Sequence, residues 1–85
     1  MDLFTEIKPI IAKKLAVNEE LVTKNAHLQF DLGADSLSIL KLSVEISEKY
    51  GIQLQVEDIV ELENIGEMVS LVASKINAAE SKINT

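Results

Sequence analysis

A short segment near the middle of the chain combines turn-forming residues with a hydroxyl at the start of a predicted helix. The segment reads Asp31-Leu32-Gly33-Ala34-Asp35-Ser36-Leu37. Gly33 can adopt a left-handed or tight backbone conformation that a side chain would disfavour, and Asp35 and Ser36 are residue types favoured at helix starts. Free N–H groups and the positive end of the helix dipole attract anions at such a position. The segment therefore predicts a serine hydroxyl at a helix end that would favour an attached anionic group.

This segment resembles the Asp-Ser-Leu attachment motif of the acyl carrier proteins, and the resemblance extends over roughly residues 3–77. In that family the serine carries phosphopantetheine through a phosphodiester, and the thiol of this arm carries acyl groups as thioesters. The resemblance implies that Ser36 is the attachment site and that coenzyme A supplies the group. It also implies that Asp35 helps to position a magnesium ion while a phosphopantetheinyl transferase primes the chain, with no permanent metal.

Two other chemistries fit the same residues less well. As a hydrolase nucleophile, Ser36 lacks the glycines of a nucleophile elbow, and nothing places the single histidine, His27, beside it. A calcium loop starting at Asp31 would need glycine at its sixth position and glutamate at its twelfth. Those positions hold Ser36 and Leu42, so we expect no calcium site.

A plain helix cap is the simplest alternative role for the serine. A capping box requires Glu or Gln three residues after the cap. Ile39 follows Ser36 at that spacing and Ser38 follows Asp35, so we expect no capping box.

Apolar spacing predicts an all-α fold: a small four-helix bundle with three longer helices, one short helix and a long ordered loop between the first two. Pro9 disfavours a helix interior, so we expect the first helix to start near Thr5 and to end near Leu15. The second spans 36–50 and ends at Gly51, a favoured terminator. A short helix covers 57–62, and Asn64 caps a last helix whose apolar stripe, which includes Met68, reaches Ile76. Residues 1–77 form the domain, and 78–85 form a polar tail that frays.

The loop over residues 16–35 shows no sustained period, and loops of this length are usually functional or internally structured. We expect apolar anchors to pin it to the core. These anchors are Val17, Leu21, Val22, Leu28 and Phe30.

The second helix carries two apolar rows at helical spacing, Leu37/Leu40/Val44 and Ile39/Leu42/Ile46. Taken with the resemblance, the residues after the serine predict a docking patch for partner enzymes. Its members are Leu37, Ile39, Leu40 and Lys41, with a charged rim of Glu45, Glu48, Glu57, Asp58 and Glu61. An alkyl cargo is expected to enter an aliphatic pocket formed by Leu40, Val44, Ile46, Leu62, Val69 and Val72.

Acidic residues are concentrated in the part of the chain that begins at the motif. The net charge is −6, and residues 31–67 hold nine acids against two lysines. This balance argues against nucleic acid as a ligand, because phosphate binding needs a basic surface. Partner enzymes with basic docking patches are the natural complement. Acidic residues that only keep the protein soluble are the simpler explanation.

The rest of the composition limits the chemistry and the location. Cysteine is absent, so the sulfur of any thioester must belong to an added group. No stretch approaches the about 18 apolar residues of a membrane span, and acids stand where a signal peptide would be basic. We expect a monomer in the cytoplasm with no catalytic residues of its own.

The leading interpretation is a carrier that shuttles acyl thioesters between enzymes of fatty acid biosynthesis. Ser38 and Lys41 stand where acids are common in the carriers of that pathway. A carrier for a specialised polyketide, lipid or aminoacyl pathway therefore stays open. A third alternative is an unmodified helical adaptor that binds a basic partner through its acidic face.

Overall fold

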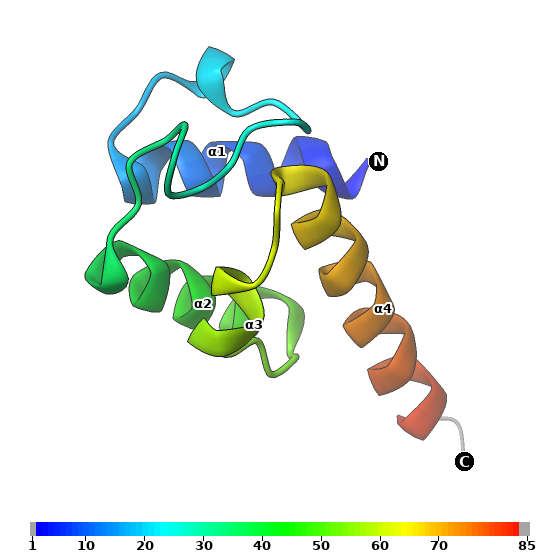
Figure 1. Cartoon of the computed structure of the whole chain (residues 1–85). Helices are drawn as coiled ribbons and strands as arrows, with labels where there is room; N and C mark the ends of the chain where they lie inside the picture. The colour runs from blue at the N-terminus through cyan, green and yellow to red at the C-terminus, as the bar shows by residue number, and fades with distance from the viewer. Residues whose placement is uncertain (1, 84–85) are drawn as a thin grey trace.

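Four α-helices surround one aliphatic core in the computed structural model, which describes residues 2–83 (Figure 1). The helices are α1 (Leu3–Leu15), α2 (Ser36–Tyr50), α3 (Val56–Val60) and α4 (Ile65–Ile83), and a short 3-10 helix, η1, covers Glu19–Leu21. Strands do not occur within this range. The predicted all-α bundle with three longer helices and one short helix is confirmed.

The first helix begins earlier than Pro9 suggested. Asp2 is the N-cap and α1 starts at Leu3, so Pro9 lies inside the helix, and the expected start near Thr5 is wrong. Leu3 and Phe4 pack against the core, and this burial favours the two extra residues. Pro9 and Thr5 are both exposed. The Thr5 carbonyl loses its usual donor four residues later, because proline has no N–H.

The core is built almost entirely from aliphatic side chains of all four helices. Side chains that are at most 2% exposed include Ile7, Ile11, Ile39, Leu42, Ile46, Ile59, Ile65, Met68 and Val72. Met68 is a core residue, as predicted. Only one of the two apolar rows of α2 takes part, namely Ile39, Leu42 and Ile46. The other row, Leu37, Leu40 and Val44, lies on the outer surface with about half of each side chain exposed.

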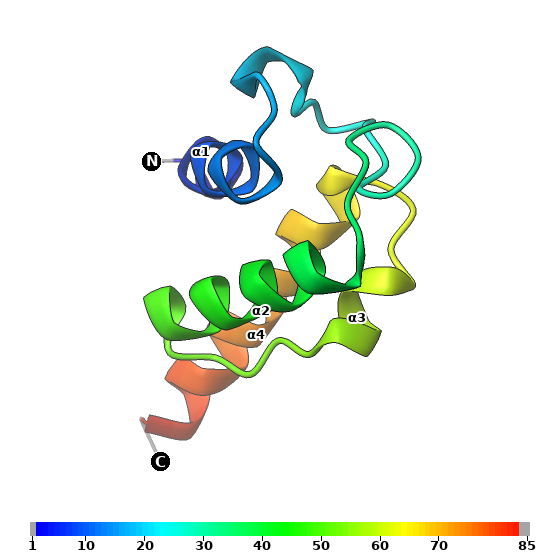
Figure 2. The ribbon, with the colours of Figure 1, turned by 90° about the vertical axis from the view of Figure 1, so that its left-hand side faces the viewer.

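The loop from α1 to α2 is ordered because its backbone pairs with the first turn of α4. The N–H groups of Ile65 and Gly66 donate to the carbonyls of Ala26 and Lys24, both at 2.9 Å. A Cβ on Gly66 would lie 3.3 Å from the Lys24 carbonyl oxygen, so the missing side chain permits this approach. Figure 2 shows the loop passing beside the start of α4.

Apolar anchors hold this loop at fewer points than predicted. Val22 and Leu28 are buried as expected, whereas Leu21 is 55% and Phe30 86% exposed. Leu21 and Phe30 are therefore not anchors. Phe30 instead stacks on the ring of His27 with 4.3 Å between the ring centroids.

The last helix is longer than its apolar stripe. Asn64 caps α4 by accepting a hydrogen bond from the Glu67 N–H at 2.9 Å, as predicted. The helix then continues to Ile83, so residues 78–83, predicted to belong to a polar tail that frays, are helical. Residues 84 and 85 lie outside the described range.

A hydrogen bond joins the C-terminal end of α2 to the first turns of α1. The Tyr50 hydroxyl donates to Glu6 Oε1 at 2.9 Å. Burial of the ring, followed by the bond to Glu6 and its negative charge, raises the pKa of Tyr50 to about 12 from 10.0. Because the folded pKa exceeds the unfolded value, this contribution to stability is complete below pH 10 and is lost as the pH rises through 12.

We expect tyrosinate absorbance to titrate with a midpoint near 12 in the folded protein. Tyr50 is the only tyrosine and tryptophan is absent, so the signal reports this side chain alone. In Glu6→Gln the midpoint should move part of the way back toward 10.0, because the negative charge is gone and burial remains. A wild-type midpoint at 10 would contradict both the burial of the ring and the bond to Glu6.

Candidate functional site

The turn that precedes α2 is closed by its own backbone. The Ala34 N–H donates to the Leu28 carbonyl at 2.9 Å, and the Gly33 N–H donates to the Gln29 carbonyl at 3.2 Å. Gly33 has φ of +73°, and a Cβ there would meet no atom within 4 Å. Backbone conformation, not lack of space, therefore requires glycine at this position.

Side chains of the same loop complete this closure. The Asp31 carboxylate accepts from the His27 N–H at 2.7 Å, and His27 Nδ1 accepts from the N–H groups of Gln29 and Phe30. Asp31 and His27 thus brace the loop that leads to the serine. Among residues 2–83, no group of three or more His, Cys, Asp or Glu residues is arranged to hold a metal ion.

The first turn of α2 is capped by a reciprocal pair of hydrogen bonds. Asp35 is the N-cap, and its Oδ1 accepts from the Ser38 N–H at 2.9 Å. The Ser38 Oγ in turn accepts from the Asp35 N–H at 3.0 Å. The expectation that no capping box forms is therefore wrong, because the hydroxyl of Ser38 takes the place of the usual Glu or Gln.

Because Asp35 is the N-cap of α2, the Ser36 hydroxyl is not needed to cap the helix. Ser36 is the first residue of α2 and is exposed. Within the described part of the chain, its hydroxyl forms no hydrogen bond with another residue. An accessible hydroxyl at the positive end of a fifteen-residue helix suits an attached phosphodiester. The geometry therefore fits a phosphopantetheine group on Ser36.

Capping lowers the pKa of the Asp35 carboxyl below its ordinary 3.8, chiefly through the hydrogen bond from the Ser38 backbone N–H and then through the Ser38 hydroxyl. A depressed pKa stabilises the fold above pH 3.8, and this contribution is lost as the pH falls through the lower folded value. We expect the Asp35 carboxyl carbon, followed by NMR, to titrate below 3.8. In Ser38→Ala, which lacks the hydroxyl, the pKa of Asp35 should move toward 3.8. Identical titrations in both proteins would contradict this.

One residue of the predicted docking patch on α2 is buried instead of exposed. Leu37 is 59% and Leu40 48% exposed, whereas Ile39 is 1% exposed and belongs to the core. Ile39 therefore cannot form part of a docking surface. Val44 on α2 and Val60 on α3, exposed at 48% and 42%, are surface apolar residues that the predicted patch left out. Val44 could have been included from the sequence, because it follows Leu37 and Leu40 at helical spacing.

The predicted charged rim is present, but two of its members already have partners. Glu45 accepts from Lys14 of α1 at 2.8 Å, and Asp58 lies 3.9 Å from Lys75 of α4. The remaining rim residues are exposed and form no ion pair with another described residue. They are Glu48, Glu57 and Glu61.

Of the six residues predicted to line an acyl pocket, four belong to the core or pack against it and two do not. Leu40 and Val44 are on the outer surface, so their assignment to an interior pocket is wrong. Ile46 and Val72 are fully buried, and Leu62 and Val69 are partly buried against the core. The helical period alone could not decide which apolar row of α2 faces inward.

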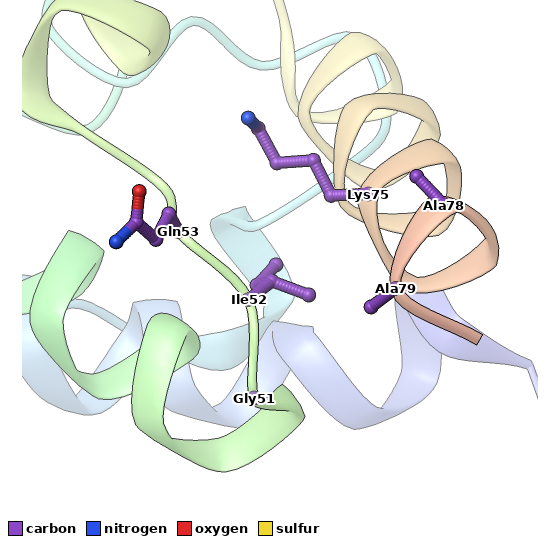
Figure 3. Close-up of a pocket in the computed structure, with 6 residues that line it drawn as sticks. All are labelled: Gly51, Ile52, Gln53, Lys75, Ala78 and Ala79. Carbon is purple, nitrogen blue, oxygen red and sulfur yellow. The ribbon is translucent and has the colours of Figure 1, made fainter. Parts of the chain in front are cut away.

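A separate hollow of about 340 Å³ lies between the α2–α3 connection and α4. Figure 3 shows Ile52 and Gln53 on one side of it and Lys75, Ala78 and Ala79 of α4 on the other. It adjoins Gly51, at the end of α2 opposite Ser36. A fifteen-residue helix separates its ends by about 22 Å. This hollow is therefore remote from the serine.

Comparisons with known proteins point to the same serine-bearing domain. Residues 5–72 match the family described as "Phosphopantetheine attachment site". The "Acyl carrier protein" of Thermotoga maritima is 35% identical over 75 residues, which covers 88% of this chain and 93% of that protein. None of the helices within residues 2–83 is long and apolar enough to cross a membrane. With the helical bundle and the free serine hydroxyl described above, these matches show that the chain belongs to the acyl carrier protein family, whose prosthetic group is phosphopantetheine.

Proposed function

We propose that Ser36 carries the phosphopantetheine arm and that the chain delivers acyl thioesters to the enzymes of fatty acid biosynthesis. The observation that carries the proposal is the exposed Ser36 hydroxyl at the start of α2, left free because Asp35 caps the helix. During priming, the Ser36 oxygen attacks the pantetheine-side phosphorus of the coenzyme A pyrophosphate. The P–O bond between the two phosphates breaks, the nucleotide leaves with the other phosphate, and the hydroxyl proton passes to a base of the transferase. Asp35 stays ionised beside this oxygen and helps to position the magnesium ion of the transferase.

Catalysis belongs to the partners. No residue of the chain is proposed as a catalytic group, and the enzyme that primes it is a phosphopantetheinyl transferase. Exchange between several enzymes requires contacts that form and break quickly. Charge steering speeds such encounters and makes them sensitive to salt. The cytoplasm is the proposed location, and a monomer is the proposed state.

Docking is proposed to use the apolar surface next to the serine and the exposed acids around it. Leu37 and Leu40 provide apolar contact, while Glu48, Glu57 and Glu61 attract basic residues of the partner. Glu45 and Asp58 contribute less, because Lys14 and Lys75 already offset their charges.

A long alkyl cargo is proposed to enter the core next to Leu62 and Val69, against Ile46 and Val72. Each buried methylene contributes about 0.8 kcal/mol, which can offset the opening of a small cavity. Melting temperature should then rise with chain length in a series of acylated proteins. Equal melting temperatures for short and long chains would place the cargo outside the core.

The experiment that tests the carrier role is priming followed by loading. Purified protein is incubated with coenzyme A, magnesium and a broad-specificity phosphopantetheinyl transferase, and intact mass should rise by one phosphopantetheinyl group. The primed protein is then offered malonyl, long-chain acyl and aminoacyl donors with their transferring enzymes. Loading of malonyl and fatty acyl groups supports fatty acid biosynthesis.

The second candidate function is a carrier for a specialised polyketide, lipid or aminoacyl pathway. The observation that favours it is the exposed Lys41 on the outer face of α2. A partner with a purely basic docking patch would be bound better by an acid at this position. Exclusive loading of aminoacyl or other specialised groups would support this candidate. A chain that stays unmodified would contradict both carrier roles and favour an acidic adaptor.

A further inference from the structure

A surface groove near the start of α2 is lined by charged residues of both signs. The groove, about 480 Å³ in volume, lies between the C-terminal part of α1 and the outer face of α2. Leu37, Leu40 and Val44 form its apolar floor. Near the serine it continues into a second hollow of about 280 Å³ that shares Lys14, Leu37 and Lys41 with it. The two hollows thus run from Asp35 and Leu37, the neighbours of Ser36, along α2 to Glu48.

Two of the four charged residues that line the groove pair with each other, and the other two can bind charges of a partner. Lys14 and Glu45, which both line the groove, form an ion pair at 2.8 Å, so their charges largely offset each other. Lys41 and Glu48 are exposed groove residues, and neither has an ion-pair partner among residues 2–83. They are seven residues apart, which is two turns or about 10 Å along one face of the helix. Lys41 is nearer the serine and Glu48 is farther from it.

We propose, on the basis of the carrier function above, that this groove receives an amphipathic helix of a partner enzyme that carries a carboxylate at its serine end and a basic residue about two turns away. The carboxylate pairs with Lys41, the basic residue pairs with Glu48, and apolar side chains between them cover Leu40 and Val44. A purely basic helix would place a like charge on Lys41. The two unpaired charges therefore fix the direction in which the partner lies on α2 and hence the side from which it reaches the arm.

The test compares two synthetic helical peptides that share one apolar stripe. The mixed peptide has glutamate and arginine seven residues apart on either side of the stripe, and the basic peptide has arginine at both positions. Affinities for the primed protein are measured by NMR titration at low salt. An exposed ion pair contributes about 0.2–1 kcal/mol, so the mixed peptide should bind wild type up to about fivefold more tightly. A spin label at its glutamate end should broaden amide signals near Lys41 more than those near Glu48.

Charge reversal at the groove supplies the decisive variant. Lys41→Glu should invert the preference, so that the basic peptide binds more tightly. Lys13→Glu is the matched control, because it makes the same charge change at an exposed α1 residue that does not line the groove. It should keep the wild-type order of the two peptides.

Several results would overturn the inference. These are equal or tighter binding of the basic peptide to wild type, an unchanged preference in Lys41→Glu, and signal changes away from the groove. Groove signals that shift with protein concentration alone would assign the groove to a second copy of the chain, and shifts on acylation alone would assign it to the cargo. Priming of each variant is measured first by mass. Failure of the wild type to be primed contradicts the carrier function, whereas a wild type that is primed but shows no peptide preference contradicts only the groove assignment.

Discussion

Ser36→Ala is expected to abolish attachment of phosphopantetheine completely. The substitution removes the only atom that is proposed to form the phosphodiester, and Ser38, the nearest other hydroxyl along α2, is engaged in the capping box. After incubation with coenzyme A and a transferase, intact mass should rise for wild type and stay unchanged for the variant. The expected difference is thus all or nothing.

The fold of Ser36→Ala should be unaffected, which makes the loss of priming interpretable. Ser36 is exposed and makes no side-chain hydrogen bond with another described residue, and alanine has the highest helix propensity. Stability should stay within about 0.5 kcal/mol of wild type. Ser70→Ala is the matched control, since it removes an exposed serine from α4 and should leave priming intact. Persistent modification of Ser36→Ala would move the attachment site to another residue.

Leu42→Ala and Leu40→Ala should have very different effects on stability, although they make the same change two residues apart. Leu42 is 0% exposed in the core and Leu40 is 48% exposed. Truncating a buried leucine costs about 2–5 kcal/mol because it loses apolar burial and leaves a cavity. A small domain of this size should therefore melt roughly 10–30 °C lower. Leu40→Ala should change the unfolding free energy by about 0.5 kcal/mol or less.

Chemical denaturation and thermal melting followed by circular dichroism measure this contrast. Similar losses of stability in the two variants would mean that both apolar rows of α2 are buried, which would contradict the docking surface and the groove. Leu40→Ala should instead weaken contacts of the primed protein with its partner enzymes and leave priming possible.

Much of the helical framework follows from local sequence. Helix α2 has the predicted bounds because Asp35 and Ser36 favour its start and Gly51, with φ of +64°, ends it. The start of α4 follows in the same way from Asn64. The start of α1 was predicted two residues late, because Pro9 argued against an earlier start even though Leu3 and Phe4 fit the apolar spacing of the helix.

Some details of the site depend on side-chain contacts that sequence patterns for caps and apolar spacing do not predict. A capping box is recognised from Glu or Gln at its fourth position, so the role of Ser38 was missed. Phe30 and Leu21 were expected inside because they are apolar, yet Phe30 is stabilised by stacking on His27 at the surface.

By itself, the sequence determined the class of fold, the turn at Gly33 and the serine that follows it. These depend on conformational preferences and hydrogen bonds over a few residues, which spacing and residue type express directly. Only the tertiary structure decided which apolar row of α2 faces the core, because two rows with the same helical period are equivalent until α1, α3 and α4 pack against one of them. The same packing brought Lys14 to Glu45 and left Lys41 and Glu48 as the unpaired charges of the groove along α2.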